Sequence, residues 1–188
     1  MAALIDSYAF SNANQSAQFY SGRFGYAQSF TGNGNILGTV VLYLGKKGSP
    51  TGIATANIYN ITGSFGSTSI PTGAALATSD GIEVSNLPIS TGAQAQQVAI
   101  TFDFTGANQI TLTNGTNYCV ALEYSGGGAL NVDVVWVSYD SSGAAAGNYS
   151  SSVDLSTWSA SAAEDFIFYV YDNNNSPSTR FYTQQGFQ

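Results

Sequence analysis

YAQSFTGNGNILGTVVLYLGKKGSPTGIATANIY, residues 26–59, is the stretch that decides the fold. It contains strand-like segments separated by two clusters of turn-forming residues, Gly32-Asn33-Gly34 and residues 45–50. Within residues 51–59, small or apolar side chains alternate with polar and aromatic ones, which is the period of a strand with one buried face. Such a hairpin cannot bury its apolar face alone, so the rest of the chain must supply a second sheet.

The rest of the chain contains more strand signals and no helical periodicity. Residues 98–104 alternate as a half-buried strand does, and DFIFYVY at 165–171 is apolar on both faces, as a central strand is. Residues 60–72, which include two glycines and a proline, predict a long surface loop. We expect one all-β domain over residues 1–172, a two-sheet antiparallel β-sandwich of the jelly-roll type, and a tail at 173–188.

The composition is that of a globular protein with a neutral polar surface. Hydrophobic residues make up 44% of the 188 residues and aromatic residues 13%, whereas only 8% are charged. Eleven carboxylates against four Lys and Arg give a net charge of -7, which disfavours phosphate backbones and anionic membranes. No apolar run approaches the roughly 20 residues that span a bilayer. We expect neither nucleic-acid binding nor membrane insertion.

The sequence does not indicate an enzyme. It has no histidine, which removes the commonest general base and the commonest metal ligand. Its one cysteine, Cys119, lies in an apolar strand-like segment and is expected to be buried. Glycoside hydrolysis needs only two carboxylates, but no spacing pairs the acidic residues of this chain.

Calcium is the one cofactor that the acidic residues suggest. Asp6 opens the first expected strand, and Asp165 and Asp172 flank the last one. If the terminal strands pair, these carboxylates could converge on one oxygen site together with backbone carbonyls. The alternative, that each Asp caps a strand end or a turn, is favoured because no D-x-D-x-D-G loop is present.

Aromatic residues near the Gly, Ala and Ser-rich segment 140–152 form another candidate site. Tyr139, Tyr149 and Trp158 could make a sugar-stacking platform or a subunit contact, since Tyr and Trp are favoured on binding surfaces. Trp158, like Trp136, could equally fill the space between the sheets.

The tail carries the last candidates. Phe181, Tyr182 and Phe187 follow a polar hinge at its start. They predict either an assembly arm that packs on a neighbouring subunit or an ordinary frayed terminus.

Several strand and turn motifs lie between residues 4 and 172, and the chain can be compared with known families through them. The motifs are QSFT at 28–31, LYLGKKGSPTG at 42–52, IYNITGSFGSTSIPTGAALATSD at 58–80, LTNGTNYCVALEYSGG at 112–127 and the closing segment from Trp158 to DFIFYVYD at 165–172. In these motifs the chain resembles jelly-roll accessory modules of the choice-of-anchor type, found in bacterial surface proteins and in phage or metagenomic viral structural proteins. The resemblance implies a non-enzymatic module displayed on a cell or virion surface, with no catalytic residues to carry over. No anchor or signal accompanies the module, which favours a particle component.

The expected function is that of a structural or interaction protein, a virion or extracellular assembly subunit that decorates a capsid, associates with a tail or forms a fibre. Its partners would be copies of itself or other virion or surface proteins. The rival function is a carbohydrate-binding module that attaches to surface glycans. Exposed Tyr or Trp side chains lining a groove would favour the rival, whereas aromatic residues buried at subunit contacts would favour assembly.

Overall fold

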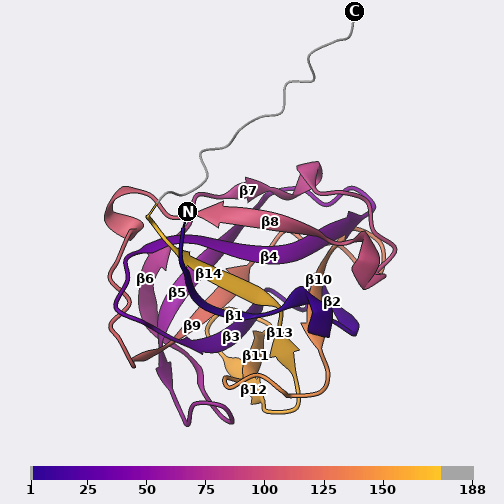
Figure 1. Ribbon diagram of the computed structural model, residues 1–188. Helices are drawn as coiled ribbons and strands as arrows, with labels where there is room; N and C mark the ends of the chain where they lie inside the picture. Colours follow the sequence, from indigo (N-terminus) through magenta and orange to yellow (C-terminus); the bar gives the residue numbers. More distant parts are fainter. Residues whose placement is uncertain (1, 175–188) are drawn as a thin grey trace, which may run out of the picture.

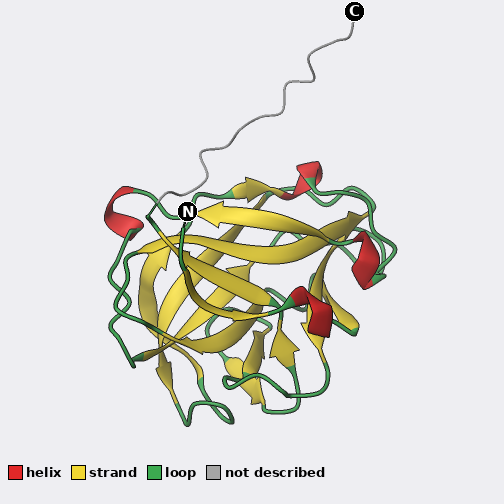
Figure 2. Ribbon diagram, in the orientation of Figure 1, coloured by secondary structure: helices red, strands yellow, loops and turns green. Residues whose placement is uncertain are grey.

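Two antiparallel sheets pack face to face in the computed structural model, which describes residues 2–174 (Figure 1). Strands make up nearly all of the regular structure, and the helices within these residues are short 3₁₀ turns (Figure 2). The strands are β1 (Leu4–Tyr8), β2 (Gln15–Phe19), β3 (Gly25–Thr31), β4 (Leu37–Lys47), β5 (Ile53–Thr62), β6 (Ile70–Thr78), β7 (Ile82–Glu83), β8 (Val98–Asp103), β9 (Asn117–Glu123), β10 (Val134–Asp140), β11 (Tyr149–Ser152), β12 (Trp158–Ser161), β13 (Asp165–Phe166) and β14 (Phe168–Asp172). The 3₁₀ helices are η1 (Phe10–Asn12), η2 (Val84–Asn86), η3 (Gln94–Gln96) and η4 (Gly106–Asn108).

The strand order is that of a jelly roll. The first sheet contains the order β1-β14-β4-β8, and the second contains β3-β9-β5-β6. These are the two facing four-stranded sheets of the jelly roll, with the first and last strands paired. In the first sheet β10 continues β14 along one edge of β4 and also pairs with β2 and β13, and in the second sheet β11 and β12 extend the order beyond β3. The predicted all-β jelly-roll sandwich is confirmed.

Inward-facing side chains of the two sheets form one hydrophobic core. Its largest fully buried members are Phe19, Phe30, Phe102, Phe104, Phe166, Leu37, Leu42, Leu44, Ile58, Leu112, Leu122 and Ile167. Burying each of these side chains stabilises the fold by roughly 1.5–3 kcal/mol relative to leaving it exposed. No helix long and apolar enough to cross a membrane occurs among residues 2–174.

The prediction of a long loop over residues 60–72 is wrong. β5 continues to Thr62 and β6 begins at Ile70, so the two strands form a hairpin with a short tip. Pro71 is tolerated in a strand because β6 lies at the edge of its sheet, where a missing N–H need not cost a ladder hydrogen bond. The glycines that suggested a loop lie at the hairpin tip, where Gly63 has φ +85°.

The second sheet is strongly curled. β12 and β6 are its two edge strands in the order β12-β11-β3-β9-β5-β6, and yet they approach each other across the outer face. A register shift between Ile58 and Asn60 in the pairing of β5 with β6 accompanies this curvature, as bulges increase local twist and bending. The outer face of the second sheet is therefore concave, and it holds the site described next.

Candidate functional site

Small side chains line the concave face of the second sheet. Ala27 of β3 and Cys119 and Ala121 of β9 point away from the core, and yet all three are fully buried. They form a cluster of their own, on which Tyr59, Ile61 and Trp158 pack. Because the alternation of a strand gives every second position to this face, three small residues there leave room for aromatic rings to lie against the sheet.

Gly25, at the start of β3, is needed for the position of Trp158. A Cβ atom on Gly25 would lie 2.6 Å from Cη2 of Trp158 and 2.9 Å from Cδ2 of Leu155. Both distances are shorter than normal carbon contacts, which lie near 3.5–4.0 Å. The Trp158 ring can therefore approach β3 only because residue 25 has no side chain.

The turn between β11 and β12 is fixed by side-chain hydrogen bonds. Ser152 Oγ accepts a hydrogen bond from Leu155 N at 2.8 Å and donates one to Thr157 O at 2.7 Å. Asp154 Oδ1 accepts from Thr157 N at 2.7 Å and from Ser156 N at 2.9 Å, and these bonds lower the pKa of Asp154 to about 2. Leu155 has φ +62°, an uncommon conformation for a residue with a side chain. Such local strain is found at sites where side-chain placement matters.

A groove of about 480 Å³ lies between this turn and β6. Its walls come from opposite edges of the same sheet. It is lined by Tyr59, Thr62, Ile70, Pro71, Thr72, Gly73, Ala74, Ala75, Leu155, Ser156 and Trp158. None of these residues is charged, and hydroxyl groups and aromatic rings are the main groups with recognition chemistry. The volume lies within the range of about 300–1,000 Å³ that is usual for small-molecule sites.

Tyr59 is held in one orientation by a carboxylate. Its Oη donates a hydrogen bond to Glu123 Oε1 at 2.6 Å. Burial raises the pKa of Tyr59 and also that of Glu123, and for Glu123 the hydrogen bond from Tyr59 opposes part of this rise. The Tyr59 ring is thus fixed in the groove by a polar contact at its far end.

Asn148 ties the β5–β6 hairpin, which forms one wall of the groove, to the start of β11. Its side chain donates to Ser69 O at the end of the β5–β6 hairpin and to Tyr149 O at the start of β11, both at 3.0 Å. Its Oδ1 accepts hydrogen bonds from Ser69 N and Ser69 Oγ, and its backbone N donates to Ser29 Oγ at 2.8 Å. Asn148 is fully buried. It therefore holds the hairpin of β6 against β11 and β3.

The three aromatic residues near segment 140–152 do not form one platform. Trp158 lines the groove, whereas Tyr149 is buried between the sheets. Tyr149 packs against Tyr26 and Tyr139, with ring centroids 5.9 Å and 6.1 Å away. Of these three residues, only Trp158 lines the groove.

The structure does not bring Asp6, Asp165 and Asp172 together, although β1 and β14 pair as expected. Asp6 accepts hydrogen bonds from Ser7 N and Thr31 N, both at 2.8 Å. Ala145 N donates to Asp165 and Ala3 N donates to Asp172, also at 2.8 Å. No group of three or more acidic, Cys or His side chains suited to a metal occurs within residues 2–174. Backbone N–H groups hold each Asp, several of them from distant segments, and the three carboxylates do not converge on one oxygen site within residues 2–174.

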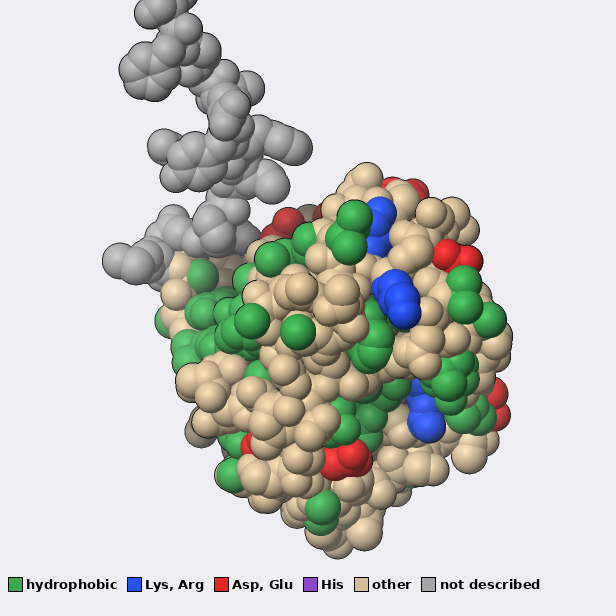
Figure 3. Space-filling view, turned by 90° about the vertical axis from the view of Figure 1, so that its right-hand side faces the viewer, with side chains coloured by type: hydrophobic (Ala, Val, Ile, Leu, Met, Phe, Trp, Pro, Cys, Tyr) green, Lys and Arg blue, Asp and Glu red, His purple; other side chains and the backbone are tan. Residues whose placement is uncertain are grey.

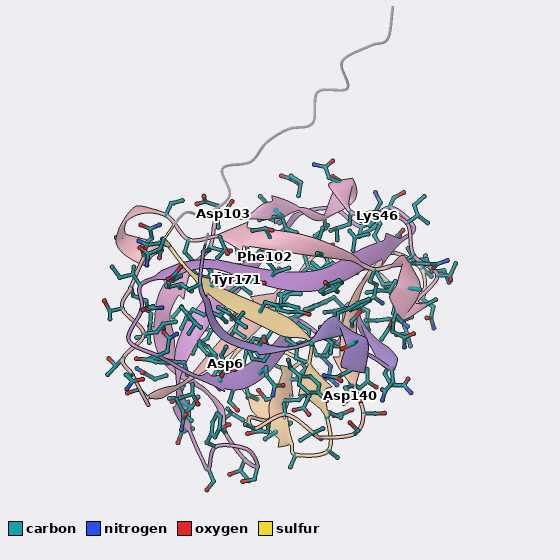
Figure 4. All side chains as sticks on the ribbon, viewed as in Figure 1. Asp6, Lys46, Phe102, Asp103, Asp140 and Tyr171 are labelled. Atoms are coloured by element: carbon teal, nitrogen blue, oxygen red, sulfur yellow. The ribbon has the colours of Figure 1, made fainter. Side chains whose placement is uncertain are left out.

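Aromatic residues also occupy the outer face of the first sheet, around Tyr171 (Figure 4). Phe10 stacks on Tyr43 with centroids 3.9 Å apart, and Tyr169 lies 6.3 Å from both Tyr43 and Tyr171. Phe10 N donates a hydrogen bond to Tyr169 Oη at 2.9 Å. These rings pack on one another and close this face.

The sequence analysis did not single out Tyr59 or the small residues beneath it. The alternation within residues 51–59 puts Tyr59 on the face opposite Ile58, and the two-residue spacing of Cys119 and Ala121, which puts both on one face of β9, was a usable signal. Phe181, Tyr182 and Phe187, the residues of the expected arm, lie outside the described residues.

Comparison with known proteins gives no match: no family model matches the chain, and no curated protein or solved structure is similar enough to count as one. Function must therefore be inferred from the surfaces of the molecule itself.

Proposed function

We propose that this protein is a non-catalytic recognition module that binds carbohydrate in the groove of the second sheet, on the exterior of a virion or a cell. The observation that carries the proposal is the pair Tyr59 and Trp158, half-buried in a groove of about 480 Å³ and set against a floor of small residues. Aromatic rings present flat apolar surfaces to the C–H faces of a sugar, and Tyr adds a polar group.

The rigidity of the groove supports binding. Hydrogen bonds fix the β11–β12 turn and the Tyr59 ring, and Asn148 ties the hairpin wall to the sheet. A site that is ordered before binding loses less conformational entropy when a ligand enters. The lining residues include no carboxylate, so the groove offers no pair of acids for glycoside hydrolysis.

A panel of surface and cell-wall oligosaccharides, screened by saturation-transfer NMR and titrated by calorimetry, tests the proposal. Trp158→Ala should lower the affinity for any ligand found by roughly tenfold or more, the loss expected for one stacking aromatic side chain. Tyr171→Ala is the matched control, because Tyr171 is a half-buried aromatic residue on the outer face of the other sheet. If no sugar binds, or if only Tyr171→Ala weakens binding, the proposed site is wrong.

An assembly subunit is the second candidate, and one end of the sandwich favours it. Ile89, Leu130 and Val132 are 80%, 53% and 54% exposed. Ile89 forms a β-bridge with Lys46, at the end of β4. Figure 3 shows Lys and Arg side chains interspersed with hydrophobic ones on this side of the molecule. Exposed apolar groups of this kind mark contact surfaces when they are contiguous.

Light scattering separates the two candidates. If the full chain assembles through this end, an Ile89→Ser, Leu130→Ser double variant should shift the oligomer toward monomer. A truncation after Asp172 should then retain the oligomer, whereas an assembly arm would require the tail. A chain that is monomeric at all concentrations contradicts the second candidate and leaves the first one standing.

A further inference from the structure

We infer that the groove selects uncharged sugars and rejects glycans that carry carboxylate or sulfate groups. This inference rests on the proposed function and names the ligand class of the same groove. It follows from the kind of groups that line the groove, from the charges that flank it and from the location of the cations.

The lining consists of groups that suit hydroxyls. Thr62, Thr72, Ser156 and Tyr59 contribute side-chain hydroxyls, and the other lining residues are apolar or glycine. A hydroxyl group can donate and accept, so it can pair with a sugar hydroxyl in either direction. A ligand carboxylate in the same place would accept hydrogen bonds without an opposite charge to offset the loss of its hydration.

The charges nearest the groove are negative. Glu123 contacts the Tyr59 hydroxyl group at 2.6 Å. Asp154 immediately precedes Leu155 and Ser156 of the wall and is held ionised by two backbone N–H groups. Like charges a few ångströms apart repel, and the repulsion is stronger where water is partly excluded. An acidic ligand in the groove would therefore be opposed from two sides.

The described cations lie away from the groove. Lys46 lies at the end of β4 in the first sheet, as Figure 4 shows, and donates to Ser85 O. Lys47 is next to it in the same strand. Arg23 donates to Ser151 Oγ at 2.5 Å and lies 5.9 Å from the ring centre of Tyr26, a residue of the core between the sheets. Lys46, Lys47 and Arg23 are the only Lys and Arg among residues 2–174, and none lines the groove.

Matched neutral and acidic oligosaccharides test the inference on the full chain. The probes are N-acetyllactosamine and its sialylated form, and neutral hexasaccharides of glucose, xylose and N-acetylglucosamine beside hexagalacturonate. We expect at least one neutral probe to bind roughly tenfold or more tightly than every acidic probe, with the difference lost in Trp158→Ala and kept in Tyr171→Ala. Because the bound ligand is uncharged, its affinity should change by less than about twofold between low and high salt.

The failures of the two proposals are distinguishable. If acidic probes bind as tightly as neutral ones and Trp158→Ala abolishes their binding, the groove binds sugars but the selectivity inferred here is wrong. If no probe binds, the proposed function fails and the selectivity fails with it. If Trp158→Ala does not fold, as judged by circular dichroism, competition between a neutral and an acidic probe on the unmodified chain decides between the first two outcomes.

A gain-of-function variant sharpens the test. Ser156→Lys places a cation on the groove wall next to Asp154, in an exposed turn position that tolerates a long side chain. This variant should raise the affinity for hexagalacturonate at least fivefold relative to the affinity for the best neutral probe. An unchanged preference in Ser156→Lys would show that groove charge does not set selectivity, and would overturn the inference.

Discussion

The outer faces of the two sheets both carry half-buried aromatic residues, but they use them differently. On the first sheet Phe10, Tyr43, Tyr169 and Tyr171 pack on one another, and Phe10 N donates a hydrogen bond to the Tyr169 hydroxyl oxygen. On the second sheet Tyr59 and Trp158 lie apart on small residues and border an open groove.

The difference shows what makes an aromatic residue available for binding. Exposure is similar on the two faces, so exposure alone does not separate them. The decisive features are the shape of the sheet and the size of the residues beneath the rings. A curled sheet with Gly25, Ala27 and Ala121 under the rings keeps a hollow, whereas the rings on the first sheet pack on one another.

The largest expected effect on stability comes from replacing Asn148, which ties the β5–β6 hairpin to β11. Asn148→Ala removes the side-chain partners of Ser69 N, Ser69 Oγ, Ser69 O and Tyr149 O, whereas the hydrogen bonds between Ser29 and the backbone of residue 148 remain. We expect a loss of roughly 3 kcal/mol or more in the free energy of unfolding, measured by urea denaturation. Tyr169→Phe, which removes a single hydrogen bond on the closed face, should cost no more than about 1 kcal/mol. Equal losses in the two variants would contradict the role given to Asn148.

The next largest expected effect on stability comes from the close contact between Gly25 and Trp158. Gly25→Ala should destabilise the protein by about 1–3 kcal/mol, because the added Cβ overlaps the ring. The same change should weaken ligand binding by displacing Trp158. In a Trp158→Ala background most of the added cost should disappear, which a double-mutant cycle measures as a coupling between the two sites. If the stability losses of Gly25→Ala and Trp158→Ala were additive, the strain would not come from the contact between these two residues.

A smaller effect concerns Glu123. Its folded-state pKa is raised, so the folded chain binds this proton more readily than the unfolded chain, and the contribution of Glu123 to stability falls as pH rises through its folded pKa. Glu123→Gln should therefore stabilise the protein at pH 7 by less than about 1 kcal/mol and lose this advantage near pH 3. Thermal unfolding between pH 3 and pH 7 checks the trend, with Glu83→Gln as the exposed control. A stability difference that does not depend on pH would contradict it.

The smallest expected effect is the pH response of the turn between β11 and β12, which forms one wall of the groove. Asp154 has its pKa lowered to about 2, so its hydrogen bonds are complete above its ordinary pKa and are lost as pH falls toward 2. The amide chemical shifts of Ser156 and Thr157 should titrate together in that range. In Asp154→Asn this titration should vanish while the fold is retained. Independent titration of the two amides would show that Asp154 does not hold the turn.

The sequence was sufficient for the parts of the structure that depend on local pattern. Alternation placed Ala54, Ala56 and Ile58 in the core, and it placed Tyr59 on the other face. Turn residues located the strand ends well enough to predict the jelly-roll sandwich.

The groove could not be predicted in the same way, because it depends on contacts between distant segments. Ser69 and Asn148 are 79 residues apart, and no local signal pairs them. Pro71 suggested a loop, because proline is tolerated in a strand only at a sheet edge or a bulge. That β6 lies at such an edge follows from the arrangement of the whole sheet. Whether Tyr149 or Trp158 would be buried depended on the curl of the second sheet, which only the whole arrangement of strands reveals.

The curl of the second sheet also has a consequence for its edge strands. An exposed edge strand can recruit another chain and start edge-to-edge aggregation. Here one edge strand, β12, has only four residues, and the other, β6, contains Pro71, which lacks an N–H, and Gly73 at φ +73°, outside strand geometry. The two edges also turn toward each other across the concave face. The edges of the second sheet are therefore poor templates for pairing with a strand of another copy.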